Sequence, residues 1–242
     1  MSWLKFTNYF ALSIFMSSLC YAKSSVITAC IDDHPPYQQL TDPPVGIHIN
    51  ALKKLATLFD ANLNFIKSPN FARCVALLES GKADVIAGLN ISEERKKFAF
   101  YAPYKVEESL VVLSRPDSKF RHYNDLYGKL IGVPRGTTYF ATFDNDRSLN
   151  KVSIPSVRNG IKILIKERID LVITSELVAK SLIDEINALE IKTTVIERVN
   201  KNNQISYFGF SKKHKLPLTD AMIIEKTKAA FNLGYFTNDE SN

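Results

Sequence analysis

Short runs of β-branched and apolar residues alternate along this chain with longer segments whose apolar residues recur every three or four positions. The short runs are typical of buried strands, and the longer spacing is typical of helices with one buried face. In the first ninety residues the pattern predicts three strands separated by two helices, in the order 26–31, 47–60, 63–66, 71–80 and 84–88. This alternation is typical of a parallel sheet covered by helices.

A phrase in which an amphipathic helix runs directly into a buried strand occurs twice, at 76–86 and again at 163–173. The two copies predict two α/β lobes built on related plans. Three further strands are predicted around the second copy, at 130–133, 152–154 and 191–196.

Two more predicted strands, 109–114 and 205–210, are interpreted as crossings between the lobes. We expect the chain to leave the first lobe at one and to return at the other, with a last helix packed on the first lobe. The predicted division is 23–114 together with 205–242 for lobe 1, and 115–204 for lobe 2. Two crossings make a hinge, and ligands of α/β folds bind in clefts at the carboxyl ends of parallel strands.

The first 22 residues have the parts of a secretory signal peptide. Lys5 lies near the start, an apolar stretch covers 10–19, and small residues precede a polar run. Cleavage after Ala22 is predicted, which places the protein in the periplasm. The alternative is a buried N-terminal helix. Lipid modification of Cys20 is disfavoured, because Leu19 stands where such sites carry Gly or Ala.

Cys30 and Cys74 remain after the predicted cleavage, out of three cysteines in the sequence. In an oxidising compartment such a pair predicts a disulfide. The alternative is two free thiols that pack as small hydrophobic residues.

The formal net charge of +6 is spread along the chain. Its densest runs, at 96–97 and 212–215, are short, and acidic residues intervene elsewhere. Such a spread is typical of a solvated surface, so we expect no nucleic-acid partner.

Motifs for catalysis are missing from the sequence. It contains no nucleophile elbow, no His-Glu-x-x-His, no phosphate-binding loop and no dinucleotide fingerprint. The four histidines have no ligand-like spacing. We therefore expect a protein that is not an enzyme and that uses neither a metal nor a cofactor.

The most informative run covers residues 88–104. It resembles the signature of the bacterial extracellular solute-binding proteins of family 3, the polar amino-acid binders of ABC importers. Further phrases fall in the family's order and spacing, at 46–47, 71–84, 125–129 and 133–138. The resemblance implies the two-lobed α/β fold of type II periplasmic binding proteins, in which a mostly parallel sheet flanked by helices forms each lobe and two hinge crossings join them.

Arg95 is the residue to which the resemblance assigns the ligand's carboxylate, together with Gly88 and Asn90. A guanidinium offers a rigid fork of donors suited to a carboxylate. Asn90 and Ser92 are predicted on the turn after a strand, where short polar groups and backbone N–H groups can converge on the same anion. Without the resemblance, Arg95 would be interpreted as a surface arginine paired with a neighbouring glutamate.

In lobe 2, Thr137 and Thr138 follow a predicted strand and precede a predicted helix. A helix N-terminus there is a second anion site, and the resemblance implies that Thr138 closes over the carboxylate. A simple threonine N-cap is compatible with both. The resemblance also places Phe71 and His34 at cleft positions that are often aromatic in the family.

One departure from the family concerns the ligand's ammonium. Family members that bind α-amino acids usually carry an aspartate at the position of Ser175 in this chain. A desolvated ammonium without a charged partner is costly, so the change weakens the case for an α-amino acid. Either Asp33 or Glu176 substitutes, or the ligand is another small carboxylate.

These observations predict a monomeric periplasmic protein that captures a small carboxylate-bearing ligand, a polar amino acid or analogue, in a cleft between its lobes. It would deliver the ligand to the membrane permease of an ABC importer. Two alternatives keep the fold: a ligand-sensing protein that reports to a receptor, and a cyclic-acid dehydratase with Glu176 as its acid.

Overall fold

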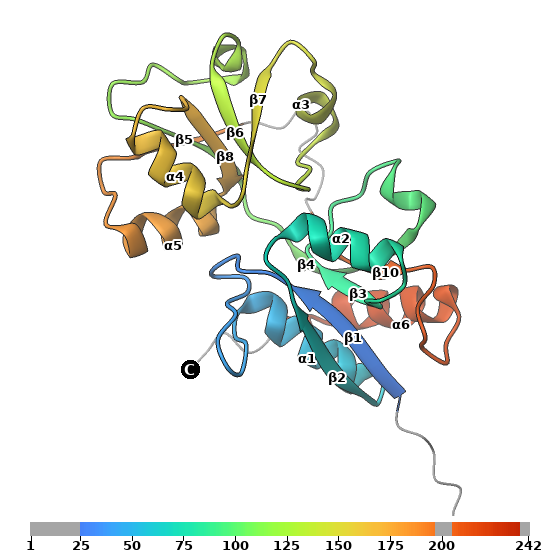
Figure 1. Ribbon diagram of the computed structural model, residues 1–242. Helices are drawn as coiled ribbons and strands as arrows, with labels where there is room; N and C mark the ends of the chain where they lie inside the picture. The colour runs from blue at the N-terminus through green and yellow to red at the C-terminus, as the bar shows by residue number, and fades with distance from the viewer. Residues whose placement is uncertain (1–24, 197–204, 238–242) are drawn as a thin grey trace, which may run out of the picture.

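The computed structural model describes residues 25–196 and 205–237. They form two α/β lobes, each built on one five-stranded sheet (Figure 1). The predicted signal peptide lies outside the described residues. Within the described residues, no helix is both long enough and apolar enough to cross a membrane.

The first lobe has the predicted strand–helix alternation, with strand order β2-β1-β3-β10-β4. The first three strands are parallel, and β10 runs antiparallel between β3 and β4. Its strands are β1 (Ser25–Ile31), β2 (Ala61–Lys67), β3 (Val85–Ala87), β4 (Ala99–Val106) and β10 (Ile205–Ser211). Its helices are α1 (Ile47–Leu58), α2 (Phe71–Glu79) and α6 (Asp220–Asn232), with a short 3₁₀ turn η1 (Arg95–Lys97).

The second lobe repeats this plan with strand order β7-β6-β8-β5-β9. Strands β7, β6 and β8 are parallel, whereas β5 runs antiparallel to both β8 and β9. Its strands are β5 (Leu110–Ser114), β6 (Leu130–Pro134), β7 (Asn150–Ile154), β8 (Leu171–Ser175) and β9 (Lys192–Val195). Its helices are η2 (Tyr123–Leu126), α3 (Ala141–Asn145), α4 (Val157–Ile165) and α5 (Glu176–Ile186).

The predicted boundary between the lobes after residue 114 is wrong. All five residues of β5 are buried, and the strand pairs with β8 and β9 in the second sheet. An apolar run of this kind satisfies its backbone in the centre of a sheet and not in a linker. The first crossing is therefore the short segment 107–109. The second predicted crossing, 205–210, is strand β10 and pairs with β3 and β4 in the first sheet, so the return to the first lobe precedes it and lies outside the described residues.

The disulfide between Cys30 and Cys74 is present, which confirms the predicted pair over two free thiols. Both residues are buried, and the bond ties the end of β1 to α2 across 44 residues of chain. Closing a loop of this length stabilises a fold by about 4 kcal/mol in the chain-entropy account. The bond therefore holds α2 against the carboxyl end of β1.

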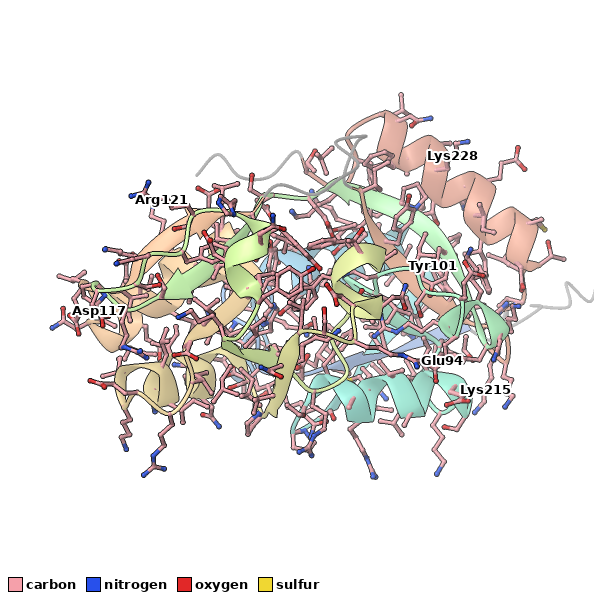
Figure 2. All side chains as sticks on the ribbon, turned by 90° about the horizontal axis from the view of Figure 1, so that it is seen from above. Glu94, Tyr101, Asp117, Arg121, Lys215 and Lys228 are labelled. Atoms are coloured by element: carbon pink, nitrogen blue, oxygen red, sulfur yellow. A yellow bond between two sulfur atoms is a disulfide. The ribbon has the colours of Figure 1, made fainter. Side chains whose placement is uncertain are left out.

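Charged side chains project outward over both lobes (Figure 2). Asp117 and Arg121 point away from the outer end of the second lobe, and Lys215 and Lys228 lie toward the far end of the first. This arrangement agrees with the spread of charge along the sequence.

Candidate functional site

A cavity of about 130 Å³ lies between the lobes and is lined by residues of both. It adjoins the carboxyl ends of β1 and β3 in the first lobe and of β6 and β8 in the second. This is the edge at which α/β folds bind ligands. A space of this size holds a small molecule, since one water needs only about 10–15 Å³ on the same measure.

Arg95 is the central cation of this cavity. It begins the turn η1 after β3, and only 6% of its surface is exposed. Its Nη1 donates to the Asn90 carbonyl at 2.9 Å and to Thr138 Oγ1 at 3.0 Å, and its Nη2 donates to the Gly136 carbonyl at 2.5 Å. Two of these acceptors belong to the second lobe, so Arg95 joins the lobes across the cleft.

Arg95 retains donors for a ligand. A guanidinium has five N–H groups, and three of them are used by these bonds. The Nε–H and one Nη2–H have no acceptor among the described residues, and no carboxylate of the described chain pairs with Arg95. Burial lowers the pKa of Arg95, although a guanidinium remains a cation at neutral pH. The alternative interpretation of Arg95, a surface arginine paired with a neighbouring glutamate, is therefore wrong.

Phe71 and Asn90 surround Arg95 in the cavity wall. The Phe71 ring lies 5.8 Å from the guanidinium carbon, close enough for a cation–π contact. The Asn90 side-chain amide donates to the Thr138 carbonyl and so also crosses the cleft. Both residues line the cavity, as the sequence predicted for a binding site here.

Gly88 lines the cavity but does not offer its N–H to it, because that group donates to the Tyr207 carbonyl at 3.0 Å. Its φ is +75°, and a Cβ there would lie 2.5 Å from His48 Cε1. Glycine is required at this position by close approach as well as by the backbone conformation.

Ser92 does not line the cavity. Its hydroxyl accepts from the Arg95 N–H at 3.3 Å, so it supports the turn that carries the arginine. Glu176 does not line the cavity either; it lies exposed in the first turn of α5.

Thr137 and Thr138 line the cavity from an irregular turn after β6. The predicted helix N-terminus at this place is wrong, because α3 begins only at Ala141 and Phe140 is its N-cap residue. The chain continues without regular structure between β6 and the helix. The two threonines therefore contribute their hydroxyl and backbone groups, and not a helix terminus.

Ser175 lines the cavity at the end of β8. It is also the N-cap residue of α5, where its hydroxyl accepts from the Val178 N–H at 3.4 Å. Tyr37 of the first lobe reaches across to it, and the two hydroxyls lie close together. The position brings no charge to the cavity.

One wall of the cavity is aromatic and uncharged. The rings of His34, Tyr37 and His48 stack in sequence, with centroids 5.6 Å and 4.5 Å apart. Burial lowers the pKa of His34 to about 4 and that of His48 well below its ordinary value. Both imidazoles are therefore neutral at pH 7. His34 lies in the cavity wall, whereas the contributions of Tyr37 and His48 were not predicted.

The acidic residues of the cavity were missed by the sequence reasoning, apart from Asp33. Asp32 is 9% exposed, and Gln38 donates to its Oδ1 at 2.6 Å. Glu107 and Glu108 line the cavity from the crossing segment. The available signal for Asp32 was its position directly after a buried strand, at the same sheet edge as Gly88 and Asn90.

Comparison with known proteins identifies the family. The model of the bacterial extracellular solute-binding proteins, family 3, matches residues 26–216. This chain belongs to that family. The match covers both lobes and includes every residue named above as lining the cavity.

Two curated relatives and one solved structure are similar to this family 3 protein. "ABC transporter arginine-binding protein 1" of Escherichia coli (strain K12) is 32% identical over 142 residues, 57% of each chain. "Arginine-binding periplasmic protein" of Mannheimia haemolytica is 23% identical over 223 residues, 90% of this chain and 89% of the relative. Holo ArgBP from T. maritima has a TM-score of 0.70 at 20% identity, with 87% of this chain and 90% of the other covered.

The chain thus matches little more than half of the first relative and most of the second. The structural likeness confirms the two-lobed fold that the family resemblance implied, each lobe being a sheet flanked by helices. Members of family 3 are binding proteins. Among the described residues, no cluster of three or more His, Cys, Asp or Glu side chains could hold a metal ion.

Proposed function

We propose that this family 3 protein captures a small carboxylate-bearing ligand, a polar amino acid or a close analogue, in the cavity between its lobes. It delivers the ligand to the membrane permease of an ABC importer and works in the periplasm as a monomer, without turning the ligand over.

The observation that carries this proposal is the state of Arg95. A buried guanidinium with unused donors beside a cavity is complementary to a carboxylate, which can accept two parallel hydrogen bonds from it. No acidic side chain among the described residues competes for those donors. A carboxylate-bearing ligand would supply the negative charge that pairs with the Arg95 guanidinium.

The way in which the lobes meet supports capture by closure. Arg95 and Asn90 of the first lobe bond to the turn at 136–138 of the second. A ligand held by both partners stabilises the closed arrangement, because it gains contacts there that an open cleft lacks. Closure would also present a surface composed of both lobes to a permease.

The printed names of the two curated relatives support an amino acid as the ligand and the periplasm as the site of action. Ser175 weakens the case for an α-amino acid, because it offers only a hydroxyl where amino-acid binders of the family usually carry an aspartate.

Isothermal titration calorimetry with the twenty L-amino acids and a set of small organic acids tests the proposal. We expect one or a few carboxylates to bind, and Arg95→Gln to weaken that binding by about 100-fold, because a charged hydrogen-bond pair is lost in a buried site. Arg121→Gln, which changes an exposed arginine at the outer end of the second lobe, is the matched control and should bind like the parent.

Unchanged affinity in the Arg95 variant would remove the carboxylate assignment. Recovery of the bound compound, analysed by NMR after long incubation, checks the absence of turnover; a chemically altered product would overturn that part of the proposal.

A further inference from the structure

Asp32 is a buried charge that the proposed function leaves unused. It follows β1 at the sheet edge facing the cavity and is 9% exposed. Its partner is the buried Gln38, whose Nε2 donates to Oδ1 at 2.6 Å. Among the described residues, no lysine, arginine or histidine forms an ion pair with Asp32.

A carboxylate in this position is costly to ionise. Burial raises the pKa of Asp32 to about 6, and the neighbouring Asp33 acts in the same direction. An amide donor offsets only part of the lost hydration. A cation placed in the cavity would offset the rest of the lost hydration of the Asp32 carboxylate. The site is therefore complementary to a positive charge.

The other carboxylates near the cavity already have partners. Asp33 is exposed and lies 3.5 Å from Arg158 of the second lobe. Glu108 lies 2.6 Å from Lys105 Nζ and also accepts from the Tyr37 hydroxyl. Glu107 accepts from the Ser206 hydroxyl at 3.3 Å. Asp32 is therefore the buried cavity carboxylate whose partner is an uncharged amide.

Asp32 and Arg95 both line the cavity but are not paired with each other. Among the described residues, the Asp32 side chain accepts from Gln38, and the Arg95 side chain donates to Asn90, Thr138 and Gly136. The cavity thus has an anion-binding part and a cation-binding part that do not neutralise each other. Ser175 adds a hydroxyl and no charge.

We propose that Asp32, oriented by Gln38, is a specificity-determining residue that binds a cationic nitrogen of the ligand, which makes the preferred ligand a zwitterion. The inference rests on the proposed function, in which Arg95 holds the carboxylate. The cationic nitrogen is either an α-ammonium or a charged group of the ligand's side chain, and the chemistry at Asp32 is the same for both.

Four compounds separate these charges in calorimetry with the full mature chain. L-arginine has all three charged groups, 5-guanidinopentanoate lacks the α-ammonium, L-citrulline has a neutral side chain, and agmatine lacks the carboxylate. If another amino acid binds more tightly in the first screen, its matched analogues are used instead. We expect removal of one of the two nitrogen charges to weaken binding to the parent by about tenfold or more, because a charged contact in a buried site is lost.

Asp32→Asn should abolish the preference for the compound that keeps the nitrogen charge. The variant should then bind that compound and its analogue without the charge with affinities within about twofold of each other. Asp42→Asn is the matched control: it removes an exposed carboxylate of the first lobe that does not line the cavity, and it should leave the preference unchanged. The affinity of Asp32→Asn for the analogue without the cation reports an intact cleft. Whichever nitrogen analogue loses affinity in the parent identifies the group at Asp32.

The two levels of the proposal fail differently. If no carboxylate binds the parent, or if agmatine binds as well as L-arginine, the proposed function fails and the inference with it. If carboxylates bind through Arg95 but neither nitrogen charge matters, or if Asp32→Asn keeps the full preference for the zwitterion, the inference fails and the proposed function stands.

Discussion

The first lobe lines the cavity with buried charges, whereas the second lobe lines it mainly with hydroxyl groups. Arg95 and Asp32 come from the first lobe, and Thr137, Thr138 and Ser175 come from the second. Arg135 also lines the cavity from the second lobe, but it is exposed. Buried charges fix the position and orientation of a ligand, while hydroxyls can donate or accept as the ligand requires. Under the proposed function, the buried charges of the first lobe select the ligand, and the hydroxyl groups of the second lobe close over it.

Away from the cavity the two lobes share the same hydrogen-bond arrangement. The Asp84 carboxylate accepts from the Thr28 N–H at 2.8 Å, and the Asp170 carboxylate accepts from the Leu130 N–H at 2.9 Å. In each lobe the aspartate N–H donates back to the carbonyl of the same residue. The repeated phrase of the sequence thus preserves the connection between neighbouring parallel strands, while the segments after the strands differ and carry residues that line the cavity.

The largest expected difference between the lobes concerns the disulfide in the first. Replacing Cys30 and Cys74 by serine should lower the free energy of unfolding by about 4 kcal/mol, because the unfolded chain regains the entropy of a 44-residue loop. Urea unfolding followed by hydrogen exchange measures this loss and assigns it to a lobe. Equal loss of protection in both lobes would show that they unfold as one unit.

The two equivalent aspartates should differ in their effect on stability. Asp84 is 3% exposed and also accepts from the Lys215 N–H at 3.0 Å, whereas the Asp170 side chain is 34% exposed and faces Arg115 at 3.6 Å. Asp84→Ala leaves two backbone N–H donors without their buried acceptor and should cost about 3 kcal/mol, against about 1 kcal/mol for Asp170→Ala. Thermal unfolding of both variants compares them; equal losses would contradict the difference in burial.

Asp32→Asn should make the unliganded protein more stable at pH 7, by about 2 kcal/mol. Burial raises the pKa of Asp32 from 3.8 to about 6, so the folded state binds a proton more tightly than the unfolded state does. Below about pH 4 Asp32 is protonated in the folded and the unfolded state and does not lower the free energy of unfolding. As the pH rises from 4 to 6, ionisation of Asp32 lowers the free energy of unfolding progressively. The variant's advantage should grow over the same interval, as measured by urea unfolding at several pH values. An advantage independent of pH would exclude this cause.

The smallest predicted effect is on closure. Thr138→Val removes the hydroxyl that accepts from Arg95 across the cleft and should weaken ligand binding by about fivefold, mainly through faster dissociation. Stopped-flow kinetics measures the two rates. Thr142→Val, an exposed threonine in α3, serves as the control. A slower association with unchanged dissociation would place Thr138 in the initial encounter instead.

Much of the fold could be predicted from the sequence because each element depends on its own residues. The helical spacing at Ile49, Leu52 and Leu55 gives a helix with that face buried. Strand β5 was also predicted, but the sheet to which it belongs was not. An apolar run of this kind can be buried in the sheet of either lobe, and its pairing depends on residues far away in the sequence.

The binding site was predicted less completely. The family signature led to Arg95 and Asn90, yet Ser92 and Glu176 turned out to lie outside the cavity. The direction of a side chain on a turn depends on the packing of the neighbouring segments, and a sequence pattern does not contain this information. The rings of His34 and Tyr37, in the connection between β1 and α1, stack with His48 of α1. The spacing of these residues in the sequence does not by itself predict such a stack.

The sequence by itself determined the alternating elements, the repeated lobe plan, the cysteine pair and the buried arginine's place in a known signature, since these follow from periodicity, residue chemistry and local order. Only the tertiary structure decided which lobe receives β5, which acidic residues face the cavity, and that Asp32 lies there with an amide as its partner. Such properties arise when distant segments pack together and remove water from charged groups, and no local pattern records that desolvation.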